Sequence, residues 1–136
     1  MHTSVRGIIF YNDGYILIHR RKKRDDGSIR DYYVVPGGKM EENETKEETV
    51  VREVWEEIGI KVKPVETLLE YESDYDNSIQ IFMECEYISG VVGTGNGPEF
   101  NSPEYTGEYM IEIIDREKIE NLNIVPEEIK DIIKEL

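Results

Sequence analysis

The feature that most constrains this chain is the segment REVWEEIGI, residues 52–60, in which three glutamates fall within five positions. The apolar spacing around it predicts a helix over about residues 45–58. Because each helical residue turns by about 100°, Glu53, Glu56 and Glu57 should share one face of roughly 100°. The helix should therefore present a dense acidic surface at a fixed position.

The opposite side of the predicted helix is apolar. Val51, Val54, Trp55 and Ile58 form a stripe that we expect to pack on a sheet. Gly59 follows directly, and glycine favours the left-handed conformation that ends many helices. The pattern thus predicts a helix with one buried face, one acidic face and a glycine cap.

The acidic face has two interpretations. It is either the solvated side of an ordinary amphipathic helix or a site for a cation. An exposed glutamate usually has a basic residue four positions further on the same helix. Here the positions four after Glu53, Glu56 and Glu57 hold Glu57, Ile60 and Lys61, and Lys61 lies beyond Gly59, where the helix is expected to end. Three neighbouring carboxylates also suit a hard divalent cation such as Mg²⁺. The local pattern leaves both interpretations open.

The rest of the chain predicts an α+β fold, a mixed sheet with helices packed on it, in one domain over residues 1–136. A turn at Asn12-Asp13-Gly14 joins the first two strands, residues 21–31 read as a polar loop, and Pro36-Gly37-Gly38 ends the third strand. A glycine-rich stretch at 90–107 reads as a long loop. Strands are expected at 4–11, 15–20, 32–35, 62–72, 78–88 and 109–114, and a second helix at 126–136.

The composition limits the classes of molecule that this protein is expected to bind. A formal net charge of −14 argues against a nucleic-acid polymer, whose backbone requires a broad basic face. No apolar run approaches the length of a membrane span, and the first residues do not resemble a signal peptide. The single cysteine, Cys85, excludes an internal disulfide and suits a reducing compartment. We therefore expect a cytoplasmic protein that does not bind membranes.

Charge is unevenly distributed along the chain. Five consecutive basic residues occupy positions 20–24, whereas eight glutamates occur between positions 41 and 57. The basic run is either a solvated loop or a rim that attracts an anionic substrate.

The spacing of residues before and within the acidic helix resembles the sequence pattern of a known family. Reading GGKMEENETKEETVVREVWEEIGI from Gly38 gives a glycine, five residues, Glu44, seven residues and then residues 52–60. This pattern resembles the Nudix box of the Nudix (MutT-type) hydrolases at every defining position. The resemblance implies an α/β/α sandwich and hydrolysis of a diphosphate linkage with Mg²⁺ or Mn²⁺.

The resemblance also implies roles for residues of the helix. Glu53, Glu56 and Glu57 would be metal ligands, and one of them would also help to deprotonate the attacking water. Arg52 would pair with a box glutamate and hold its carboxylate in position. Glu44 would stabilise the connection between loop and helix.

Residues outside the helix receive roles as well. Gly38 would allow a tight turn, the Gly37 carbonyl would supply a metal oxygen, and Lys39 would contact phosphate. Members of the family often add a carboxylate from a later loop, for which this chain offers Glu99 and Glu104. We favour Glu104 because of its distance from the last strand.

The expected substrate is a nucleoside triphosphate-like small molecule, or another nucleoside diphosphate joined to a further group. Candidate phosphate contacts are Arg6 and Arg20, or Arg30. Candidates for stacking on a base are Tyr32, Tyr33 and Phe100. The alternative is a protein of this fold that binds a ligand or another protein without turnover.

Overall fold

A computed structural model describes residues 1–93 and 108–136, so Glu99, Phe100 and Glu104 lie outside the described residues. In this part of the chain seven strands form one sheet in the order β3-β2-β1-β6-β5, with β4 paired to β1 and β7 paired to β2. The strands are β1 (His2–Tyr11), β2 (Gly14–Lys23), β3 (Ile29–Val34), β4 (Gly37–Lys39), β5 (Ile60–Ser73), β6 (Ser78–Gly90) and β7 (Glu108–Ile114).

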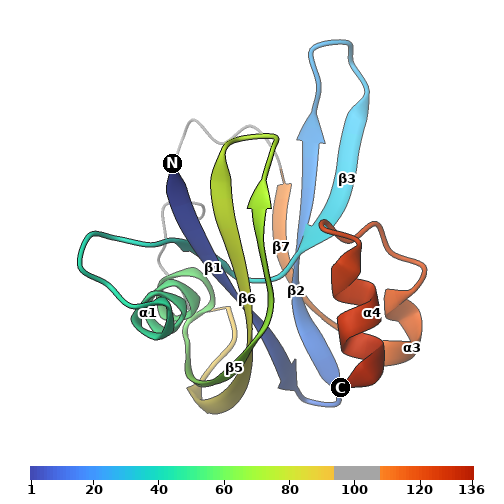
Figure 1. Ribbon diagram of the computed structural model, residues 1–136. Helices are drawn as coiled ribbons and strands as arrows, with labels where there is room; N and C mark the ends of the chain where they lie inside the picture. The colour runs from blue at the N-terminus through green and yellow to red at the C-terminus, as the bar shows by residue number, and fades with distance from the viewer. Residues whose placement is uncertain (94–107) are drawn as a thin grey trace.

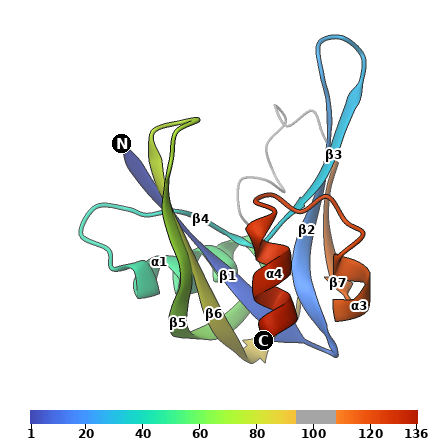
Figure 2. The ribbon, with the colours of Figure 1, turned by 45° about the vertical axis from the view of Figure 1, so that its right-hand side comes forward.

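The sheet is mixed and has helices on both faces, as predicted (Figure 1, Figure 2). β1 and β6 are parallel, whereas the other pairs are antiparallel. Helix α1 (Lys46–Ile58) packs on one face through a core that includes Val50 and Val54. Ile129 and Ile133 of α4 (Glu128–Glu135) belong to a second core on the other face. The expected α/β/α sandwich is confirmed.

Helix α1 is fixed at both ends by its own sequence. The Thr45 hydroxyl accepts a hydrogen bond from the Glu48 N–H at 3.1 Å, and the Glu48 carboxylate accepts one from the Thr45 N–H at 2.9 Å. This reciprocal pair is a capping box. At the other end Gly59 has φ of 81°, and its N–H donates to the Trp55 carbonyl, as its predicted role as a cap requires.

The buried stripe of α1 differs from the prediction. Trp55 was expected in the core but is 56% exposed, whereas Glu57 is only 6% exposed. The fully buried apolar positions are Val50, Val54 and Ile58. The centre of the buried arc is therefore turned toward Glu57, which brings one edge of the acidic face against the sheet.

The basic run continues a strand, so the prediction of a loop over residues 21–31 is wrong for its two ends. β2 and β3 pair from Ile18↔Val34 to Lys23↔Ile29. The turn between them is closed by a hydrogen bond from the Arg24 N–H to the Ser28 carbonyl at 2.7 Å. Successive side chains project from opposite faces of a strand, so a run of like charges does not prevent β2 from pairing with β3.

The double glycine also forms a strand rather than only ending one. β4 pairs antiparallel with β1, with Gly37 opposite Arg6 and Gly38 opposite Val5. A Cβ atom at Gly37 would overlap the Val5 carbonyl oxygen and the Arg6 Cα atom. Only glycine allows the two backbones to approach this closely.

The last part of the chain adds a short helix, α3 (Arg116–Ile119), that the sequence analysis did not predict. Pro126 precedes α4 rather than lying inside it. Cys85 is buried, and burial raises the pKa of its thiol to about 12. Across the described ranges, no helix has the length and apolar character needed to cross a bilayer.

The orientation of α1 predicts effects of different size for two neighbouring substitutions. Val54→Ala should lower the free energy of unfolding by roughly 2 kcal/mol, because it opens space in a packed core. Trp55→Ala should change it by no more than about 0.5 kcal/mol, because the ring is mostly exposed. Urea unfolding followed by circular dichroism measures both, and equal losses would contradict this orientation.

Candidate active site

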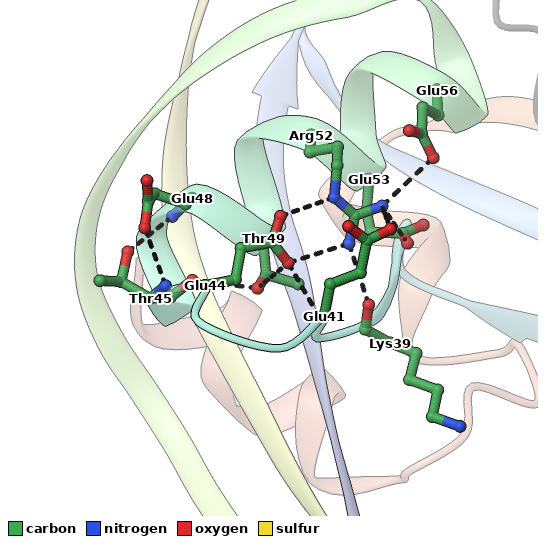
Figure 3. Close-up of polar contacts among 9 residues, drawn as sticks. All are labelled: Lys39, Glu41, Glu44, Thr45, Glu48, Thr49, Arg52, Glu53 and Glu56. Atoms are coloured by element: carbon green, nitrogen blue, oxygen red, sulfur yellow. Dashed lines mark hydrogen bonds and ion pairs between the residues drawn. The ribbon is translucent and has the colours of Figure 1, made fainter.

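Arg52 is the centre of the acidic cluster (Figure 3). Its Nε atom donates to Glu44 Oε2 at 2.7 Å, and its Nη1 atom donates to Glu53 Oε1 at 2.8 Å and Glu56 Oε2 at 3.3 Å. Its Nη2 atom donates to Glu44 Oε1 and to the Lys39 carbonyl, each at 3.0 Å. One guanidinium thus holds three carboxylates and the end of β4 in fixed positions.

Glu44 anchors this network to the start of α1. Besides Arg52, its carboxylate accepts hydrogen bonds from the Thr49 hydroxyl at 2.8 Å and from the Glu41 N–H at 3.0 Å. The hydrogen bonds from Arg52 are the main reason why the pKa of Glu44 falls from 4.5 to about 2. The same pairing raises the pKa of the Arg52 guanidinium above its usual value. Both groups are therefore charged at neutral pH.

The double glycine brings β4 against the remaining glutamates. The Gly37 N–H donates to Glu57 Oε1 at 3.0 Å, and a Cβ atom at Gly38 would overlap the Glu53 carboxylate. The prediction that these glycines belong to the site therefore fits the geometry. The reason for Gly38 is close packing against Glu53 rather than a turn.

The three box glutamates differ in their access to solvent. Glu57 is 6% exposed, whereas the side chains of Glu53 and Glu56 are 18% and 41% exposed. Glu56 is thus the most open to water, and Glu57 is held against the backbone of β4.

Two predicted contacts, Lys39 and Arg20, are described outside the Arg52 network. The side chain of Lys39 extends away from the Arg52 network, although its carbonyl belongs to that network (Figure 3). Arg20 lies on β2, where its guanidinium is 5.9 Å from the ring centres of both Tyr32 and Tyr109. Glu104 lies in the part of the chain that is not described. The structure gathers Glu44, Glu53 and Glu56 around the Arg52 guanidinium.

Some of the oxygen donors at this site suit a hard divalent cation. Within residues 1–93 and 108–136, no group of three His, Cys, Asp or Glu side chains is arranged as a ready metal cage. Mg²⁺ does not require such a cage, because it usually keeps several waters and binds one or two carboxylates together with substrate phosphates. The partly exposed carboxylates of Glu53 and Glu56, beside the backbone of Gly38, provide such oxygen donors.

Two contributors to this site were missed in the sequence, namely Thr49 and Glu41, which support Glu44. The position of Thr49 could have indicated a role, since a polar residue at a fully buried helical position needs a partner. Arg6, a candidate phosphate contact, donates from its Nη1 atom to the Val35 carbonyl at 2.9 Å beside β4.

The fold and the site together define a class of protein. A mixed sheet between helices supports an arginine that clamps glutamates of one helix beside a glycine-rich strand. This arrangement places the Nudix-box pattern of residues 38–60 at one connected site.

Comparison with known proteins agrees with this class. The NUDIX domain model matches residues 1–132, so the chain belongs to the NUDIX domain family. A MutT-like protein from Streptomyces ambofaciens is 33% identical over 114 residues, which cover 82% of this chain and 70% of that protein. The structure of the MutT protein from Methanosarcina mazei Go1 has a TM-score of 0.67 at 23% identity, covering 98% of this chain and 91% of the other. An ADP-ribose pyrophosphatase from Streptococcus suis has a TM-score of 0.60 at 17% identity, covering 91% and 79% respectively.

The lowered pKa of Glu44 predicts how acid should affect stability. Because the folded-state pKa of about 2 lies below the ordinary value of 4.5, the ionised carboxylate stabilises the fold above pH 4.5. This contribution is lost as the pH falls toward 2. Glu44→Gln should therefore be less stable than the parent at pH 7, and the difference should shrink between pH 4.5 and 2.

Glu42→Gln is the matched control, because Glu42 is exposed and lies in the same loop. Its difference in unfolding free energy from the parent should stay small throughout that pH range. Urea unfolding at several pH values gives both curves. A Glu44→Gln difference that does not depend on pH would contradict the role of Glu44 as a paired carboxylate.

Proposed function

We propose that this protein is a Mg²⁺- or Mn²⁺-dependent hydrolase that cleaves a diphosphate linkage in a nucleoside polyphosphate or related nucleoside diphosphate. The observation that carries the proposal is the fixed position of Glu53 and Glu56, both held by Arg52, beside Gly38. Positioned carboxylates next to an accessible backbone suit a reaction in which a charged diphosphate must be oriented and attacked by water. Similarity in fold to an ADP-ribose pyrophosphatase supports a nucleoside diphosphate derivative as the substrate.

Each residue of the site has a distinct task in this proposal. The chemistry that a bound Mg²⁺ ion would supply is neutralisation of the diphosphate and a more acidic water molecule. Glu53, Glu56 and Glu57 would hold the ion, with help from the Gly37 carbonyl. Glu56 is the most exposed of the three and so the best placed to accept a proton from water. Arg52 and Glu44 hold these groups in place rather than meeting the substrate.

A pocket beside the site suits the nucleoside. It has a volume of about 400 Å³ and its lining includes Arg6, Arg30, Tyr32, Tyr71, Gln80 and Phe82. The Arg30 guanidinium lies 4.1 Å from the centre of the Tyr32 ring, and the rings of Tyr71 and Phe82 are stacked 6.3 Å apart. Aromatic rings with a few polar groups are typical of sites that bind a base and sugar.

The register of the strands connects this pocket to the glutamates. Arg6, which lines the pocket, lies directly opposite Gly37 in the β1–β4 pair, and the Gly37 N–H donates to Glu57. In this proposal a nucleotide with its base in the pocket extends its phosphates past the β1–β4 pair toward the box glutamates.

One observation favours the alternative, a protein of this fold that binds a ligand without turnover. Arg52 occupies carboxylate oxygens of both Glu53 and Glu56, and the described residues contain no ready cage of three metal-binding side chains. The two candidates differ in one measurable property, which is release of product in the presence of Mg²⁺.

The proposed activity predicts the effect of a conservative change in the site. Glu57→Gln should stay folded, because the amide oxygen can still accept the Gly37 N–H, while kcat falls by about a hundredfold or more. Release of phosphate or nucleotide from a panel of nucleoside triphosphates and nucleoside diphosphate derivatives, with and without Mg²⁺ or Mn²⁺, measures this.

Glu47→Gln provides the control for this experiment, because Glu47 is exposed at the start of the same helix. Its rate should match that of the parent within about twofold. Undiminished turnover by Glu57→Gln would remove that residue from the mechanism. Binding of a nucleotide by the parent without any turnover would favour the alternative.

A further inference from the structure

The pocket proposed for the nucleoside has hydrogen-bonding groups on its floor. Three neighbouring strands contribute alternate residues to its lining, namely Ser4 and Arg6 of β1, Gln80 and Phe82 of β6, and Tyr71 and Ser73 of β5. Side chains two positions apart on a strand lie on the same face of a sheet. These six side chains therefore form one continuous surface of the pocket.

Strand register places three of these polar groups next to one another. Gln80 of β6 lies opposite Ser4 of the parallel strand β1 and opposite Tyr71 of the antiparallel strand β5. The side chains of paired residues on one face are neighbours in a sheet. The Gln80 amide is thus the central group of a row that has a hydroxyl-bearing residue on each side.

The Gln80 amide is held by a buried serine. Its Nε2 atom donates to Ser78 Oγ at 2.7 Å, and Ser78 Oγ donates to Asp76 Oδ1 at 2.5 Å. Ser78 is fully buried, and its hydroxyl has a single proton, which the Asp76 carboxylate accepts. This hydrogen bond is the main reason why the pKa of Asp76 lies below its ordinary value. Asp76 is therefore ionised at neutral pH and keeps the serine proton on its own side.

This relay also determines which way the Gln80 amide faces. If the amide were reversed, its oxygen would lie against a serine oxygen whose proton is already donated to Asp76. The network therefore assigns the amide nitrogen to the side of Ser78. Among residues 1–93 and 108–136, Ser78 is the only hydrogen-bond partner of the Gln80 side chain. The amide oxygen and the second N–H are left for a ligand in the pocket.

The chemistry of an amide favours a base as that ligand. A neutral amide offers one donor beside one acceptor, and it pairs best with an edge that offers the same two groups in reverse. Nucleobases have such edges, in which an amine lies beside a ring nitrogen or a carbonyl lies beside a ring N–H. A phosphate group offers mainly acceptors, and Arg6 in the same pocket suits it better.

We propose that Gln80 determines the specificity of this protein for the base of its substrate, by pairing with an edge on which one donor and one acceptor are adjacent. Ser78 and Asp76 are positioning residues that hold the amide for this pairing. The inference rests on the proposed function and deepens it, because it assigns recognition of the base to one side chain. Two sources of such an edge fit, the amine-bearing bases adenine and cytosine and the carbonyl-bearing bases guanine and uracil.

Binding of non-hydrolysable compounds tests this inference. Isothermal titration calorimetry in the presence of Mg²⁺ measures the affinity for the α,β-methylene nucleoside 5′-diphosphates of adenine, cytosine, guanine and uracil. The base that binds most tightly identifies the source. Its matched compound is the same nucleotide with the donor of that edge removed or methylated. The parent protein should bind the matched compound roughly tenfold more weakly, which is the loss expected for a bidentate base contact.

Two variants test whether this difference comes from Gln80. Gln80→Met keeps the length of the side chain but removes its hydrogen bonds, so it should bind the two compounds with equal affinity. Ser78→Ala should reduce the ratio of the two affinities without abolishing it, because the amide remains but is no longer held. Ser89→Ala is the matched control, since Ser89 is exposed at the other end of the same strand, and it should keep the ratio of the parent. A merely structural defect would lower both affinities together and leave their ratio unchanged.

The inference is overturned if the parent does not distinguish the matched compounds, if Gln80→Met keeps the ratio of the parent, or if Ser78→Ala and Ser89→Ala give the same ratio. The first of these outcomes requires no variant, so it applies even where a substitution unfolds the protein. Failure of the proposed function gives a different result, because calorimetry would still show the ratio while the panel of hydrolysable nucleotides released no product. Absence of binding by all four compounds would overturn the inference together with the assignment of the pocket.

Discussion

The interaction on which the rest of the site depends is the contact of one guanidinium with several carboxylates. Arg52 bonds to Glu44, which precedes α1, and to Glu53 and Glu56 on α1. Without Arg52 these carboxylates would repel one another. Arginine suits this position because its planar fork presents five N–H donors in a fixed geometry. A lysine could neutralise charge here, but it lacks the planar fork through which Arg52 contacts both oxygens of Glu44.

The glycine pair extends this order from the helix into the sheet. Gly38 allows the Glu53 carboxylate to lie against β4, and Gly37 donates to Glu57 while pairing with Arg6 across the strand. The carboxylates, the short strand and the pocket beside Arg6 are therefore parts of one rigid arrangement. The backbone, rather than any long side chain, sets the distance between the pocket and the acidic residues.

Local patterns predicted much of this arrangement, and tertiary contacts determined the rest. The acidic face and the cap at Gly59 depend only on helical spacing and on one residue's conformational preference, so both could be predicted from the sequence. The exposure of Trp55 and the burial of Glu57 could not, because the rotation of the helix is set by contact with β4. Strand β4 itself was missed because paired glycines usually indicate a turn. The pairing of β2 with β3 through the basic run was missed because consecutive charges conceal an alternation that only the register of the partner strand reveals.

The most direct test of the central claim is whether the carboxylates held by Arg52 bind a divalent ion in the absence of substrate. Electron paramagnetic resonance of Mn²⁺ titrated into the protein counts bound ions without requiring any turnover. The account predicts binding by the parent that is lost or at least about tenfold weaker in the double variant Glu53→Gln/Glu56→Gln, while the fold remains intact by circular dichroism. Mn²⁺ binding of equal strength in both proteins, or none in the parent, would contradict it.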